Sequence, residues 1–72
     1  MKQTKLIELR NQFGLTQQDI VKVLGISEGA YSQKETGKRG FNQKEMSLIF
    51  TIFKAHDPHL NMQDIFFDLK VS

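Results

Sequence analysis

Apolar residues recur at steps of three and four along most of the chain, which is the period of an α-helix. The repeats are separated by short stretches that contain glycine or the pair Asp57-Pro58, and such residues end helices. The pattern predicts an all-α fold with five helices, at about residues 2–13, 17–24, 28–34, 43–54 and 61–67. The apolar faces expected to form the core contain Leu6, Leu9, Phe13, Leu24, Met46, Ile49, Phe50 and Phe53.

Side chains that cap helix N-termini precede four of these helices. Thr16, Asn42 and Asn61 are each followed three residues later by an acid, as in a capping box. Ser27 is also a favourable N-cap. Gly25 is expected to end the second helix, because glycine adopts a left-handed backbone without a Cβ penalty.

The third helix, residues 28–34, offers few apolar side chains of its own. Only Ala30 and Tyr31 are expected to point inward, so most of this helix should face solvent. An isolated helix this short does not persist in water, so the second helix is expected to support it. Residues 35–41, Glu-Thr-Gly-Lys-Arg-Gly-Phe, are interpreted as a loop in which two glycines flank two cations.

The length of 72 residues suits one domain, which we place at residues 1–72. The absence of cysteine excludes disulfides and thiolate zinc sites. No apolar run reaches the length of a membrane span, and the N-terminus lacks the apolar stretch of a signal peptide, so a cytoplasmic protein is expected.

Charge is distributed unevenly along the chain. Residues 1–44 contain eight Lys and Arg against four Asp and Glu, whereas residues 45–72 contain two against four. The basic part is suited to face a polyanion, although a merely solvated surface also gives such asymmetry.

The most informative stretch is residues 17–37, QQDIVKVLGISEGAYSQKETG, interpreted as helix, three-residue turn and helix. Gly25 opens the turn, and Ile20, Leu24, Ile26 and Tyr31 are expected to point toward one centre. This spacing fits a helix-turn-helix, which holds an exposed helix rigidly, and the major groove of DNA admits one helix.

The chain resembles the DNA-binding domain of lambda-type repressors and Cro proteins, the Xre family. The resemblance covers nearly the full length. Its tail, residues 64–72, is similar to short regulators encoded by phages of Gram-positive bacteria. The matching segments are Leu9-Arg10, Gly14-Leu15-Thr16-Gln17-Gln18-Asp19-Ile20, Leu24-Gly25-Ile26-Ser27 and Tyr31-Ser32-Gln33-Lys34-Glu35-Thr36-Gly37-Lys38-Arg39.

Three positions depart from the family pattern. Members often have a large apolar residue where Lys34 stands, a small one where Val21 stands, and proline near Phe41-Asn42. Lys34 is therefore expected to lay its stem against the protein with its amine outward.

Readers of base edges should be polar and exposed. The outward face of the third helix contains Ser27, Glu28, Gly29, Ser32 and Gln33. The resemblance implies that the positions of Glu28, Gly29 and Gln33 meet bases. Gln33 is suited to adenine and Glu28 to cytosine, although Glu28 also complements the helix dipole as an ordinary first-turn acid.

Phosphate contacts should come from cations and exposed amides. Gln17 begins a helix, where the dipole favours an anion. Arg10 either contacts phosphate or braces Glu35, as the family pattern implies, and Lys38-Arg39 has the alternative of a solvated turn. The expected phosphate contacts are Arg10, Gln17, Lys34, Lys38, Arg39, Asn42 and Lys44.

Several apolar residues fall outside the main helical stripes, including Ile7 and Val23. They are either a slightly apolar surface or part of a dimer patch. We expect a homodimer, because two-fold proteins match half-site operators. The expected patch contains Leu48, Ile52, Phe66 and Phe67.

An enzyme is not expected. No Ser-His-Asp or Cys-His arrangement and no glycine-rich phosphate loop is visible, and the chain is short for a substrate pocket. His56 and His59 are interpreted as ordinary loop histidines, because a metal site needs three or four ligands and only Asp57 is near. No cofactor, metal, membrane or small-molecule substrate is expected.

The leading hypothesis is a phage or prophage transcriptional regulator, and in particular a repressor that binds double-stranded palindromic DNA as a dimer. The alternative is a protein-binding module of the same fold, such as an antitoxin or anti-repressor. The sequence does not separate repressor from Cro-like roles, and it does not give the operator sequence.

Overall fold

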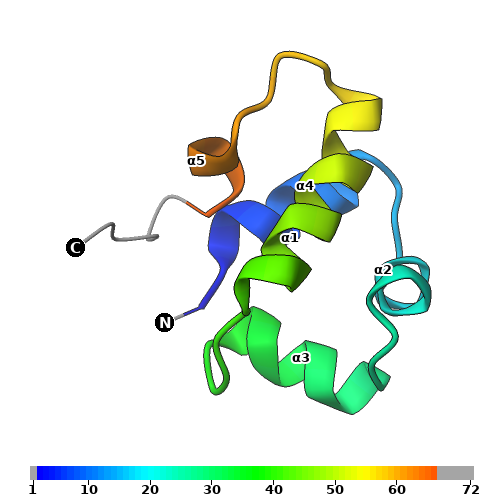
Figure 1. The fold of residues 1–72 in the computed structure, drawn as a ribbon, viewed down its shortest axis with the longest axis vertical. Coiled ribbons are helices and arrows are strands. Elements are labelled where there is room, and N and C mark those ends of the chain that lie inside the picture. Colours follow the sequence, from blue (N-terminus) through cyan, green and yellow to red (C-terminus); the bar gives the residue numbers. More distant parts are fainter. Residues whose placement is uncertain (1, 67–72) are drawn as a thin grey trace.

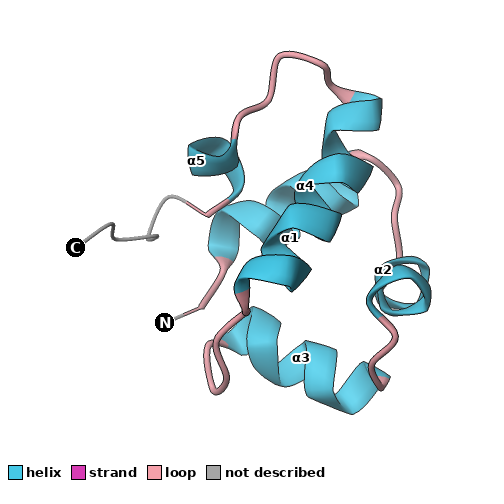
Figure 2. Ribbon diagram, in the orientation of Figure 1, coloured by secondary structure: helices cyan, strands magenta, loops and turns pink. Residues whose placement is uncertain are grey.

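The computed structural model describes residues 2–66, which form five helices and no strand (Figures 1 and 2). The protein is therefore all-helical, as the periodicity predicts. The helices are α1 (Thr4–Gln12), α2 (Gln17–Leu24), α3 (Glu28–Thr36), α4 (Gln43–His56) and α5 (Met62–Ile65).

The helix starts follow from the predicted caps. Thr16, Asn42 and Asn61 each accept from the backbone amide of an acid three residues later, whose carboxylate accepts from the cap's own amide. The Ser27 hydroxyl accepts from the Ala30 amide at 3.1 Å. Each cap satisfies amides that have no carbonyl partner within the helix.

The C-terminal ends of α3, α4 and α5 differ from the prediction, and α4 continues to His56 rather than to residue 54. α3 continues to Thr36, so the placement of Glu35 in a loop was wrong. The helix ends where Gly37 adopts a left-handed backbone, with φ of 90°. α5 is a single turn that ends at Ile65, and the predicted range beyond residue 66 lies outside the described residues.

The core of the described residues is one cluster to which every helix contributes. α2 packs against α3 and α4, while α1 packs against α3 and α5. Of the eight predicted core residues, four are buried and four lie partly buried against the cluster. The fully enclosed side chains are Leu6, Ile20, Tyr31, Ile49, Phe53 and Ile65.

α3 lies at the lower edge of the molecule in Figure 1, with the loop to α4 beside its C-terminal end. The N-terminal segment is held at the same place, because the Gln3 amide donates to the Glu35 carbonyl at 2.8 Å. This arrangement supports α3 on one side and leaves its other side facing outward.

Candidate nucleic-acid interface

The turn between α2 and α3 is built by Gly25, Ile26 and Ser27. Gly25 has φ of 73°, a left-handed conformation that costs other residues about 1–2 kcal/mol. Its amide donates to the Val21 carbonyl at 2.8 Å, which closes α2. Ile26 packs partly buried against the core, and Ser27 immediately caps α3. The predicted convergence of apolar residues at this joint is confirmed.

α3 has one buried and one exposed side. Tyr31 and Glu35, four residues apart, are buried on the inner side. Glu28, Gly29 and Gln33 are exposed, as is the cap Ser27, and Ser32 is half-buried. The side chains predicted to read bases are therefore brought together on one outward face, with Ser32 at its margin.

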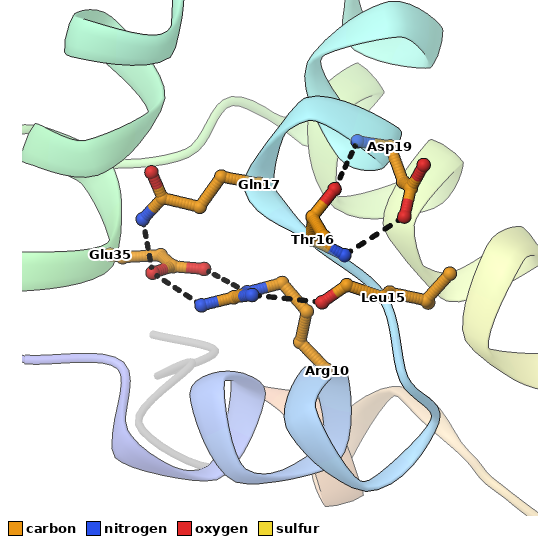
Figure 3. A network of polar contacts seen from close by, with 6 residues as sticks. All are labelled: Arg10, Leu15, Thr16, Gln17, Asp19 and Glu35. Atoms are coloured by element: carbon orange, nitrogen blue, oxygen red, sulfur yellow. Dashed lines mark hydrogen bonds and ion pairs between the residues drawn. The ribbon is translucent and has the colours of Figure 1, made fainter.

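The Glu35 carboxylate is the polar centre that holds α3 in place (Figure 3). It is 4% exposed and pairs with Arg10 of α1, whose Nε donates to Oε2 at 2.7 Å. Gln17 of α2 donates from Nε2 to Oε1 at 3.0 Å. One acid thus links α3 to both preceding helices. The burial of Glu35 was not predicted, although its i, i+4 spacing from Tyr31 indicates a shared face.

Arg10 lies inside this network rather than on the surface. Its side chain is 11% exposed, and its guanidinium also donates to the Leu15 carbonyl at 2.9 Å. The bracing alternative is the arrangement found, because the carboxylate of Glu35 already neutralises this cation. Arg10 is therefore left out of the set of cations offered to phosphate.

Tyr31 places its hydroxyl beside the same network. The side chain is fully buried, and within the described residues its Oη makes no hydrogen bond of ordinary geometry. Burial, and then the neighbouring Glu35 carboxylate, raise the pKa of Tyr31. The phenol therefore stays neutral at physiological pH, and its ring packs on Phe41 with centroids 6.0 Å apart.

The loop between α3 and α4 presents two cations. Lys38 and Arg39 are exposed, and neither forms an ion pair within residues 2–66. Their amides donate to the Gln33 carbonyl at 2.9 and 3.2 Å, which fixes the loop to the end of α3. Exposed Lys44 follows in the first turn of α4, so three cations lie close to α3 in the chain.

Lys34 does not point its amine outward, so that expectation was wrong. Its Nζ lies 3.1 Å from Glu45 Oε1 and donates to the Gly40 carbonyl at 3.0 Å. Only 12% of the side chain is exposed. A carboxylate and a carbonyl within reach satisfy the amine internally, which argues against a direct contact with phosphate.

Two expected phosphate ligands are partly occupied by hydrogen bonds within the protein. The Asn42 amide donates to Glu45 Oε1 at 3.0 Å, and Asn42 Oδ1 accepts from the Glu45 amide at 2.7 Å. The backbone amide of Asn42 is therefore already used within the cap, and its side-chain NH₂ is the donor that remains for a ligand. The Gln17 side chain donates to Glu35, so the group that Gln17 still offers to a ligand is its backbone amide at the start of α2.

The expected dimer patch is only partly on the surface. Leu48 and Ile52 are half-buried, and Ile52 packs against the core. Phe66 is 3% exposed, so its assignment to an exposed patch was wrong. The Phe66 ring packs on Phe41, with centroids 5.6 Å apart, and joins Ile65 in the core. Phe67 lies outside the described residues.

Other chemistry is sparse in the part of the chain that the structure describes. No group of three or more potential metal ligands occurs among residues 2–66. His56 ends α4 and stacks on Phe13, with ring centroids 5.0 Å apart. None of the described helices combines the length and apolar composition that crossing a bilayer requires.

These observations define the class of protein: two capped helices meet at a glycine turn, and the second presents a polar face beside three cations. The comparison with protein families agrees, because the helix-turn-helix family model matches residues 6–56. The chain belongs to this family of Xre and lambda-repressor type, whose members are DNA-binding transcription regulators. No curated protein and no solved structure gave a match.

Proposed function

We propose that the chain is a phage or prophage repressor that binds a palindromic operator as a homodimer, with α3 of each protomer in the major groove. The observation that carries the proposal is the outward polar face of α3, held from behind by the buried Glu35 network. Such a helix meets base edges without first having to order itself. The phage source is supported only by the sequence resemblance.

The proposed base contacts come from the exposed face of α3. Gln33 pairs bidentately with adenine, and Glu28 accepts from the cytosine amino group. Glu28 repels phosphate, so it sharpens specificity rather than adding affinity. Gly29 has open space above its Cα and admits a thymine methyl or a close backbone approach. Ser27 and Ser32 complete the proposed set at the margins of this face.

The proposed phosphate contacts flank this face. Lys38, Arg39 and Lys44 supply charge, and the amide at the start of α2 and the Asn42 side chain supply neutral donors. These groups fix the position of the protein on the duplex, whereas the α3 side chains choose the sequence.

Selection of bound duplexes from a random pool, followed by substitution of Gln33, tests the proposal. Gln33→Ala is expected to lose preference at one position in each half-site, at a cost of about 1–3 kcal/mol. The matched control is Gln63→Ala, which removes an equally exposed glutamine from α5. Equal affinity of the wild-type protein for every duplex would contradict sequence-specific binding.

Dimeric binding and repression have separate tests. Sedimentation with a full palindrome and with one half-site should show two protomers on the first and one on the second. A reporter whose promoter overlaps the selected operator should lose expression when the protein is present. One protomer per palindrome, or increased expression, would contradict these two parts of the proposal.

The protein-binding alternative has less support from the described residues. Of the apolar residues that motivate it, Phe66 is buried and Ile7, Leu48 and Ile52 are half-buried, and Val23, 48% exposed, is the one large exposed apolar side chain within residues 2–66. Retention of one protein partner, together with absence of DNA binding at low salt, would favour this alternative.

A further inference from the structure

Lys34 makes contacts that an apolar residue at its position would not make. Its Nζ reaches the Gly40 carbonyl at 3.0 Å and Glu45 Oε1 at 3.1 Å, and it lies 5.8 Å from the centre of the Phe41 ring. Both charged side chains are nearly covered, with 12% of Lys34 and 10% of Glu45 exposed. Water screens the attraction between two covered charges less than that between two surface charges. The Lys34–Glu45 ion pair is therefore expected to hold its geometry.

The partner carboxylate belongs to the cap of α4. Glu45 Oε1, the atom that meets Lys34, also accepts from the Asn42 amide at 3.0 Å. A single oxygen therefore joins the last turn of α3 to the first turn of α4. Through Lys34, the same contact reaches the Gly40 carbonyl between them.

The loop between α3 and α4, which contains Lys38 and Arg39, is therefore held by hydrogen bonds at both ends. At its start, the Lys38 and Arg39 amides donate to the Gln33 carbonyl. At its end, Lys34 holds Gly40 and Glu45 holds Asn42. Gly37 and Gly40 would otherwise give this loop much conformational freedom. Ordering it in advance removes an entropy cost from binding.

We propose that Lys34 and Glu45 are positioning residues for DNA binding, which hold Lys38 and Arg39 toward the phosphate backbone without touching DNA themselves. This inference rests on the proposed function. It assigns the charge of Lys34 to the loop rather than to the duplex, and it gives the buried acid Glu45 a role beyond capping α4.

A mutant cycle with the loop cations tests the inference. Lys34→Met keeps the stem and removes the amine, while Glu45→Gln keeps an oxygen that accepts from the Asn42 amide. Affinity for the selected operator and for an unrelated duplex is measured in the wild-type background and in a Lys38→Ala/Arg39→Ala background. Each single variant is expected to weaken binding to both duplexes by about three- to tenfold. Either loss should shrink to less than about twofold in the background without the loop cations, since nothing remains to be positioned.

The sign of the Glu45→Gln effect separates positioning from direct contact. A lysine that met phosphate directly would be released by this substitution, and the loss of a nearby negative charge would also favour DNA. Stronger binding by Glu45→Gln, or a Lys34→Met loss that persists without Lys38 and Arg39, would therefore overturn the inference.

Two controls keep the result interpretable. The double variant Lys34→Met/Glu45→Gln leaves no unpaired buried charge, so it should fold, and thermal unfolding confirms the folded fraction. Unchanged affinity in that folded double variant would reduce the pair to a structural role and overturn the inference. Lys54→Met removes a lysine near the opposite end of α4, whose Nζ lies 5.2 Å from the Phe50 ring, and should change affinity by less than about twofold. Failure of the wild-type protein to bind any DNA would instead contradict the proposed function itself, and this inference with it.

Discussion

At the scale of single residues, Glu35 has the largest structural consequence. It is nearly inaccessible to solvent, and its charge is compensated by Arg10 and a hydrogen bond from Gln17. Burying a carboxylate is costly unless it is paired and hydrogen-bonded. The orientation of α3 therefore depends on groups that never meet DNA.

Removal of Arg10 alone is predicted to be strongly destabilising. Arg10→Met leaves the Glu35 carboxylate buried and unpaired, and should lower the free energy of unfolding, measured in urea, by about 3–5 kcal/mol. The double variant Arg10→Met/Glu35→Gln removes both charges and should recover much of that loss. If the double variant were less stable than Arg10→Met, the unpaired charge of Glu35 would not be the cause of the destabilisation.

Asp19 makes the stability of α2 depend on pH. The Thr16 amide donates to its carboxylate at 2.9 Å, and this backbone hydrogen bond first, and the Thr16 side chain second, lower the pKa of Asp19 below its ordinary value of 3.8. A pKa lowered by folding stabilises the protein above the unfolded-state value, and the benefit is lost as the pH falls through the folded-state value. Asp19→Asn should therefore have a lower free energy of unfolding than the wild type in urea at pH 7. The difference between the two proteins should narrow below about pH 4. A difference in stability that stays constant with pH would show that the Asp19 carboxylate does not cause it.

At the scale of elements, two glycines near the joint between α2 and α3 have different structural roles. Gly25 has a left-handed backbone, whereas Gly29 lies within α3 with open space around its Cα. Gly25→Ala should cost about 1–2 kcal/mol of unfolding free energy, because a Cβ is disfavoured in that conformation. Gly29→Ala should instead stabilise the fold by about 1 kcal/mol through helix propensity. The thermal unfolding midpoint should fall for Gly25→Ala and rise for Gly29→Ala. A shift of both midpoints in the same direction would contradict these roles of the two glycines.

The sequence predicted the helices and their starts because these depend on local chemistry. Thr16, Ser27 and Asn42 act within three residues of themselves, so a linear reading finds them. Lys34 was misjudged because its partner Glu45 comes from another element. Bracing of Glu35 by Arg10 was one of two alternatives that the family resemblance offered, and the wrong part was the placement of Glu35 in a loop. A charged residue in a sequence suggests a loop or an exposed amine until the fold supplies a partner.

Phe66 was misplaced for a different reason. It lies four residues after Met62 and next to Ile65, and both of these pack on the core, so helical spacing also favours an inward position for Phe66. Its assignment to a surface patch rested on a surplus of apolar residues rather than on this local pattern. Exposure of Glu28, Gly29 and Gln33, in contrast, was predictable, because they lie away from the face of α3 that Tyr31 marks as buried.

At the scale of the whole molecule, the structure divides the cations into internal and external groups. Arg10 and Lys34 are each paired with a buried acid. Lys38, Arg39 and Lys44 remain exposed around α3. A small formal net charge of +2 is therefore compatible with a local concentration of positive charge at the proposed interface.

This division predicts the salt dependence of DNA binding. Each phosphate that a cation neutralises contributes roughly −0.9 to the slope of log affinity against log salt, so three cations give about −3 per protomer and about −5 for a dimer. Lys38→Ala should weaken all sequences alike and make the slope of a dimer about 2 less negative. Sedimentation first fixes the number of protomers on the duplex, and binding is then measured across salt concentrations. A slope near −9 for a dimer would mean that Arg10 and Lys34 also neutralise phosphates, which would require both buried ion pairs to open on DNA.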